Sequence, residues 1–304
     1  MKKEERDYMN FFIPDFAKSY QVIDKTLNLL KMYPDIFFDN VKVGAVYGNL
    51  KGAIWDGGSR FEYGMVSTDI MKQFINLYNK THNIPIRLTM TNMVLEKKHL
   101  YDTYCNTIME VFNTGMNEVL VANDLLEEYI RTNYPEYKIV RSTCAAENIP
   151  YDDSNKYYMT VLDRRQNKNW ELLKTIRNKD KIEFVVNELC YDNCPYMYSH
   201  YKRSAQRTLK FQEPEKNYCR KMHEKDFNDI LEMFPYYFHN NSEQQIWITK
   251  QEIDEIYVPM GFSNFKLVGR SYGTQYTIEG ISEYMIKPEF RHDYNILMNG
   301  LGYR

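Results

Sequence analysis

Three cysteines in the second half of the chain have the residue type and spacing of a metal site. Cys190 and Cys194 directly follow the apolar run 182–186, and Cys219 lies further along the chain. Thiolates are soft ligands that hold zinc or iron–sulfur clusters in proteins. The segment from Lys181 to Tyr201 therefore indicates a metal centre placed at the end of a buried strand, either an iron–sulfur cluster or zinc.

The spacing leaves the fourth ligand open. Cys144 follows another apolar run by a few residues and would reach the same face, so it is our candidate. His200 or His223 could replace one thiolate in a zinc site. Cys144 could instead act as a nucleophile with a distant histidine as its base. Cys105 lies on the apolar stripe of a predicted helix, which favours a core position.

Amides, carboxylates and guanidiniums follow the other apolar runs. In a barrel of parallel strands such residues meet at the carboxyl ends, where active sites lie. We expect catalysis to use Asp124, Asp163 and Glu188. We expect substrate to be oriented by Tyr47, Arg60, Asn92, Asn123, Asn187 and Arg270. Two of these residues have an alternative interpretation, since Asp124 would suit a helix start and Arg60 could be a solvated loop residue.

Short β-rich runs alternate with helical runs along the chain. This alternation predicts parallel strands joined by right-handed helical crossovers. Eight repeats of the pattern predict an α/β fold, a closed (β/α)₈ TIM-like barrel. The predicted strands are residues 41–48, 84–92, 118–124, 137–143, 157–165, 182–188, 245–249 and 265–270.

The remaining segments set the domain organisation. Residues 1–36 are predicted to form an N-terminal helical extension, and 37–304 a single barrel domain. The segment of about residues 195–244 is predicted to be an insertion after the sixth predicted strand. Thr249 and Glu252 have the spacing of a capping box, which predicts that a helix starts after the seventh predicted strand.

Composition excludes several classes of protein. A net charge of −2 over 304 residues gives no bulk attraction to DNA. Five cysteines at irregular spacing do not suggest a disulfide framework, and no apolar run suggests a signal peptide or a membrane span. We therefore expect a cytoplasmic protein without membrane contact. Kinase, Rossmann, zincin and serine-hydrolase motifs do not occur.

Several of these segments together resemble the collagenase-like peptidase family, peptidase family U-32, in particular an uncharacterised bacterial branch. The resemblance runs from Val41 to Tyr284 and is carried by residues 46–64, 84–92, 118–130, 137–143, 185–201 and 258–270. It implies a TIM-like barrel with a [4Fe–4S] cluster, to which Cys190, Cys194 and Cys219 correspond. It also implies oxygen-independent hydroxylation of an RNA base or of a small metabolite, with a partner subunit of the same family in some members.

Three functions follow from these observations. The first is an iron–sulfur barrel enzyme for redox tailoring of an RNA base or small molecule. The second is a metal-assisted peptidase or other hydrolase, in which a bound ion activates water. The third is a binding scaffold without catalysis, in which zinc only staples the insertion. Metal and sulfide content distinguishes the first function from the other two.

Overall fold

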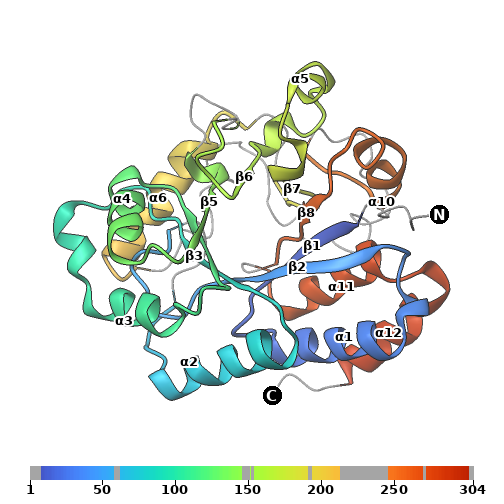
Figure 1. The fold of residues 1–304 in the computed structure, drawn as a ribbon, viewed down its shortest axis with the longest axis horizontal. Coiled ribbons are helices and arrows are strands. Elements are labelled where there is room, and N and C mark those ends of the chain that lie inside the picture. Colours follow the sequence, from blue (N-terminus) through green and yellow to red (C-terminus); the bar gives the residue numbers. More distant parts are fainter. Residues whose placement is uncertain are drawn as a thin grey trace.

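The computed structural model describes residues 8–57, 62–145, 151, 154–190, 194–212, 246–269 and 272–300. Its strands pair in parallel and in sequence order, and the last pairs with the first, so the sheet closes into a barrel (Figure 1). The strands are β1 (Met9–Pro14), β2 (Val41–Gly48), β3 (Ile86–Met90), β4 (Glu118–Val121), β5 (Lys138–Arg141), β6 (Met159–Val161), β7 (Ile182–Val185) and β8 (Asn264–Lys266). The predicted (β/α)₈ barrel is confirmed.

The first strand of the barrel lies where the sequence predicted a helical extension. Met9–Pro14 pairs with β2 on one side and β8 on the other. Phe11 and Ile13 pack outward and Phe12 packs inside the barrel, all almost completely buried. A strand buried on both faces is a continuous apolar run, which periodicity does not separate from a helix. The helix expected in residues 1–36 is confirmed as α1 (Tyr20–Met32).

The prediction of a strand at residues 245–249 was wrong. Ile246–Thr249 forms no strand, and Gln245 lies outside the described residues. The segment is buried beside β7, where the amide of Ile248 donates to the carbonyl of Val186 at 2.9 Å. Burial on all sides produced the strand-like composition. The predicted capping box is confirmed, since Thr249 and Glu252 cap each other at the start of α10 (Lys250–Glu252).

Helices surround the barrel, with α1, α2, α11 and α12 along one side of it in Figure 1 and α3 and α4 along another. Beyond α1 and α10, the helices are α2 (Thr68–Ile75), α3 (Thr103–Val111), α4 (Asp124–Asn133), α5 (Trp170–Thr175), α6 (Met197–Leu209), α11 (Thr274–Met285) and α12 (Arg291–Asn299). Short 3₁₀ or π turns are η1 (Pro34–Ile36), η2 (Asn76–Thr81), η3 (Lys97–Tyr101), η4 (Thr143–Ala145), η5 (Arg164–Gln166), η6 (Lys179–Lys181), η7 (Ile253–Tyr257) and η8 (Pro288–Phe290). The described part of the predicted insertion contains α6.

A cluster of charges fills the middle of the barrel, where branched apolar residues are usual. Arg87 of β3 donates to Glu118 of β4 at 2.6 Å and also bonds Glu183 of β7. Lys266 of β8 lies 3.4 Å from Glu183. The Arg87 guanidinium stacks over the Phe12 ring at 4.2 Å. Burial alone would lower the pKa of Arg87, but the two carboxylates outweigh it and raise that pKa above its usual value.

Candidate functional site

The carboxyl ends of β6 and β7 bring together a buried arginine, a carboxylate and a thiol. Arg164, the first residue of η5 after β6, donates to the sulfur of Cys190 at 3.1 Å. It also donates to the hydroxyl of Tyr201 on α6 at 2.9 Å and lies 3.1 Å from Glu188. Cys194 is hydrogen-bonded to Cys190 through its side chain. These five residues are called the thiol cluster.

The surroundings of Cys190 in the thiol cluster favour its neutral form. The hydrogen bond to Cys194 and burial raise the pKa of Cys190 well above its ordinary value, against the pull of Arg164. Burial lowers the pKa of Arg164, but the nearby Cys190, Tyr201 and Glu188 raise it by more. The net pKa of Arg164 therefore lies above its ordinary value. The arginine therefore carries a fixed positive charge beside two thiols. A positive charge favours a thiolate, so it would stabilise the deprotonated sulfurs that a metal requires.

Further aromatic and sulfur groups border the thiol cluster. The hydroxyl of Tyr272, which follows β8, donates to Glu188 at 3.3 Å and to the carbonyl of Leu189 at 3.2 Å. Burial raises the pKa of Tyr201, whose electrostatic neighbours include both Cys190 and Cys144. Cys144 is buried in η4 after β5. Three of the four predicted ligand cysteines thus approach one end of the barrel.

The described residues fit a metal only in part. Cys190 and Cys194 touch and offer two soft donors, and Arg164 supplies a compensating charge. Among the described residues, however, no group of three histidine, cysteine or acidic side chains converges on one point. Cys219 and His223 lie outside the described residues. The pair fits as half of a four-thiolate ligand set.

Three predicted site residues at β3 and β4 make contacts within the scaffold. The amide of Asn92 donates to the carbonyls of Ile54 at 2.8 Å and of Ala205 in α6 at 3.3 Å. Asn123 caps α4 by accepting from the Leu126 amide at 3.0 Å. Asp124 is exposed in the first turn of α4, where a negative charge favours the helix dipole.

Other predicted residues also bond neighbouring elements. Asp163 is buried and pairs with Arg165, with 2.6 Å between the closest atoms. Asn187 accepts from the Val268 amide at 2.7 Å and so ties β7 to the end of β8. Tyr47 lies inside the barrel, where its hydroxyl donates to the carbonyl of Leu267 at 2.6 Å. Arg60 and Arg270 lie outside the described residues.

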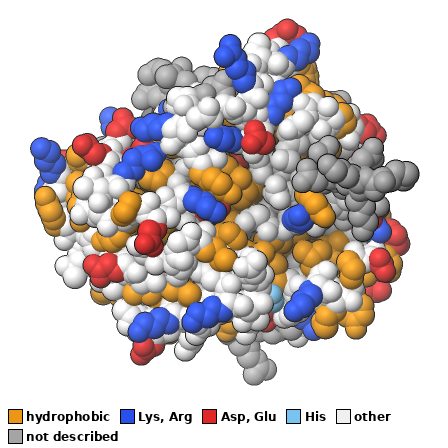
Figure 2. Space-filling model, in the orientation of Figure 1, with side chains coloured by type: hydrophobic (Ala, Val, Ile, Leu, Met, Phe, Trp, Pro, Cys, Tyr) orange, Lys and Arg blue, Asp and Glu red, His pale blue; other side chains and the backbone are white. Residues whose placement is uncertain are grey.

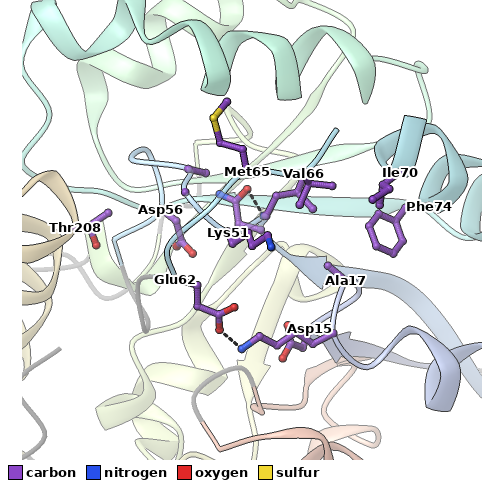
Figure 3. A pocket seen from close by; sticks show the side chains of 15 residues that line it. Asp15, Ala17, Lys51, Asp56, Glu62, Met65, Val66, Ile70, Phe74 and Thr208 are labelled. Atoms are coloured by element: carbon purple, nitrogen blue, oxygen red, sulfur yellow. Dashed lines mark hydrogen bonds and ion pairs between the residues drawn. The ribbon is translucent and has the colours of Figure 1, made fainter. Parts of the chain in front are cut away.

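A pocket of about 260 Å³ opens at the carboxyl ends of β1 and β2 (Figure 3). We call it the mouth pocket. Asp15 follows β1, Lys51 and Asp56 follow β2, and Ile70 and Phe74 come from α2. Its full lining is Asp15, Ala17, Lys18, Asn49, Leu50, Lys51, Gly52, Ala53, Asp56, Glu62, Met65, Val66, Ile70, Phe74 and Thr208.

Sequence reasoning missed the acidic wall of the mouth pocket and the central residue of the thiol cluster. Asp15 was hidden because the strand before it was not recognised. Asp56 lies in a Gly-rich loop, where the sequence pointed instead to Arg60. Arg164 stands next to the predicted Asp163 at the end of β6, so the strand-end signal was present but assigned to its neighbour.

Comparison with protein-family models, with curated protein sequences and with solved structures found no match. The fold and the side chains alone therefore define this chain as a TIM-like barrel. In the described part of the chain, no helix is both long and apolar enough to cross a bilayer. Basic and acidic side chains are interspersed over the face shown in Figure 2, so the described residues of that face form no single-sign patch.

Proposed function

We propose that this chain is a barrel enzyme whose reaction takes place at the carboxyl ends of the strands, with Cys190 and Cys194 as ligands of an iron–sulfur cluster. The observation that supports it is the contact of the two thiols beside the buried Arg164. Active sites of such barrels lie at this end. The resemblance to the U-32 family leads to the same proposal, as does the softness of the donors.

The residues around the cluster have separate roles in this proposal. Arg164 holds a positive charge at the sulfur of Cys190 and would stabilise the thiolate once a metal displaces the proton. Glu188 and Tyr201 fix the guanidinium in place through bonds of 3.1 Å and 2.9 Å. An iron–sulfur cluster would supply single-electron transfer at this position. Cys144 and Cys219 are the proposed remaining ligands.

The proposed reaction is redox tailoring, such as oxygen-independent hydroxylation, of a small molecule or an RNA base. It would take place in a reducing cytoplasm, where thiols remain available as ligands. A partner subunit of the same family would be a suitable electron-transfer companion. The mouth pocket lies at the same end of the barrel and offers space for the reacting group.

The test is metal and acid-labile sulfide analysis after anaerobic purification. We expect iron and sulfide of roughly four each per chain in the wild type, the content of one [4Fe–4S] cluster. Cys190→Ser and Cys194→Ser should each lose most of the iron and the visible absorption band. Cys105→Ala is the matched control, because Cys105 is buried in α3.

Zinc in place of iron would overturn the iron–sulfur proposal and favour a closed structural site. Iron retained in both the Cys190 and Cys194 variants would overturn the assignment of the ligands. Circular dichroism of each variant separates loss of metal from loss of fold.

A further inference from the structure

The mouth pocket has a chemical character that narrows the substrate class. We propose that it binds a small organic cation, a primary amine attached to an apolar group. The proposal rests on the proposed function, since it assigns a substrate class to the same end of the barrel. Three features carry it: the size of the pocket, the position of its carboxylates and the apolar wall on α2.

The size limits the part of a ligand that can enter the pocket. A cavity of about 150 Å³ holds one benzene molecule. The mouth pocket, at about 260 Å³, therefore has room for one ring or a short branched chain together with a polar group. A complete nucleotide with its phosphate would extend beyond this volume.

Three carboxylates line the mouth pocket, those of Asp15, Asp56 and Glu62. Asp15 is almost completely buried, whereas Lys51 is exposed and lies between Asp56 and Val66 in Figure 3. Glu62 forms an ion pair with Lys18. Asp56 accepts hydrogen bonds from the hydroxyls of Thr89 and Thr91 at 3.5 Å and 3.4 Å, which orient its carboxylate.

Asp15 has a backbone conformation that favours this position. Its φ is +67°, in the left-handed region that few residues other than glycine adopt. Its amide donates to the carbonyl of Tyr47 at 2.7 Å, which fixes the turn at the end of β1. The turn places the carboxylate group at the barrel mouth rather than on the outer surface.

These carboxylates suit an organic cation better than a metal ion. A metal held by carboxylates requires at least three donors around one point, and the carboxylates of the mouth pocket form no such group. Carboxylates spread around a pocket can instead each accept one N–H of an ammonium group. Charge-assisted hydrogen bonds of this kind contribute more than neutral ones.

The opposite side of the pocket is apolar. Ile70 and Phe74 project from α2, on the other side from Asp56 and Thr208 in Figure 3. Val66 extends the same wall. An amine whose ammonium group meets Asp15 and Asp56 would therefore place its apolar part against α2.

The experiment compares three probes of equal size by isothermal titration calorimetry. Benzylamine carries the ammonium group, benzyl alcohol is its neutral counterpart and benzoate its anionic one. We expect benzylamine to bind at least about tenfold more tightly than the other two, as one charge-assisted hydrogen bond would give. Equal binding of benzyl alcohol, or tighter binding of benzoate, would overturn the proposal.

Variants test the position of the amine. Asp56→Asn should weaken benzylamine binding by about tenfold and leave benzyl alcohol binding unchanged. Asp69→Asn, an exposed carboxylate on α2 outside the lining, is the control and should bind like the wild type. Ile70→Ser provides a second variant and should weaken both probes. Unchanged benzylamine affinity in Asp56→Asn and Ile70→Ser would overturn the proposal.

Failure of this inference is distinct from failure of the proposed function. Iron present without selective amine binding overturns the substrate class alone. Selective amine binding to a chain that holds no iron supports the substrate class and overturns the iron–sulfur chemistry.

Discussion

Two buried arginines lie at different depths of the barrel, and their partners differ in kind. Arg87 lies in the middle of the barrel between two carboxylates, which balance its charge. Arg164 lies at the mouth and bonds a thiol, a phenol and a carboxylate. Carboxylates give a stable ion cluster, whereas thiols next to a cation can be deprotonated by a metal. Arg87 is therefore structural and Arg164 is the functional candidate.

Replacing Arg87 should destabilise the barrel strongly. Arg87→Met leaves Glu118 buried without its cation and Glu183 with Lys266 alone, and loss of a buried partner costs about 3–5 kcal/mol. Urea unfolding followed by circular dichroism measures the change in the free energy of unfolding. Lys174→Met, which removes an exposed ion pair with Glu171, should leave the midpoint unchanged. An Arg87 variant as stable as this control would contradict a structural role.

The carboxylate of Glu127 should make stability depend on pH. Burial raises the pKa of Glu127, but hydrogen bonds from Lys156, Arg131 and Tyr157 lower it by more. The net pKa of Glu127 therefore lies below its ordinary value. Because the pKa of Glu127 is lower in the folded state, its carboxylate stabilises the fold at pH values above the unfolded-state pKa of about 4.3. This stabilisation is lost as the pH falls through the folded-state pKa. Glu127→Gln should therefore lose less stability on acidification than the wild type.

Unfolding midpoints at about pH 6 and about pH 3 bracket that unfolded value and measure the effect. Glu128→Gln is the matched control, because Glu128 is the exposed neighbour on the same helix. Equal acid sensitivity in the wild type and the Glu127 variant would show that this carboxylate is not stabilised in the fold.

At the scale of elements, the sequence predicted most strands correctly and misplaced two. β2 and β7 were recognisable as β-branched apolar runs that end in polar residues. β1 was missed because its phenylalanines follow a charged start and show no alternation. Ile246–Ile248 was overpredicted because a buried loop has the composition of a strand. The amino-acid composition of a segment reflects its burial, whereas a strand is defined by hydrogen-bonded pairing with a neighbouring strand.

The same distinction explains the candidate site. The contact of Cys190 with Cys194 was predictable because both residues lie on one short segment. The bond from Arg164 to Cys190 spans 26 residues and exists because β6 and β7 are neighbours in the barrel. The mouth pocket depends on the end of β1, so it could not be predicted once that strand was missed.

Removing β1 should abolish the barrel. A chain that begins at Asp15 leaves β2 and β8 without the strand that joins them, and it exposes the partners of Phe11 and Phe12. We expect loss of cooperative unfolding and aggregation, seen by circular dichroism and gel filtration. Tyr8→Ser, at an exposed residue just before the strand, should fold normally. A truncated chain with the wild-type melting transition would contradict this topology.

For the whole molecule, closure of the barrel joins the two ends of the sequence. β8 pairs with β1, so neither half of the strands forms a closed sheet alone. The apolar core between strands and helices is continuous around the barrel, from Phe11 to Met298. The predicted single barrel domain should therefore unfold as one cooperative unit.

Coincident unfolding transitions test this expectation. Trp55 lies in the loop after β2, Trp247 lies beside β7 and Trp170 begins α5, so tryptophan fluorescence reports three regions of the barrel. Fluorescence and far-ultraviolet circular dichroism should give the same midpoint in urea. Two separated midpoints would instead indicate parts of the barrel that unfold independently.

Helix α6 borders both regions of the barrel mouth. Tyr201 bonds Arg164 in the thiol cluster, the Ala205 carbonyl accepts from Asn92, and Thr208 lines the mouth pocket. A ligand that binds in one region and favours one position of α6 would change the affinity of the other region for its own ligand. Thermodynamic coupling is reciprocal, so metal at the cysteines and amine in the pocket would alter each other's binding by the same factor.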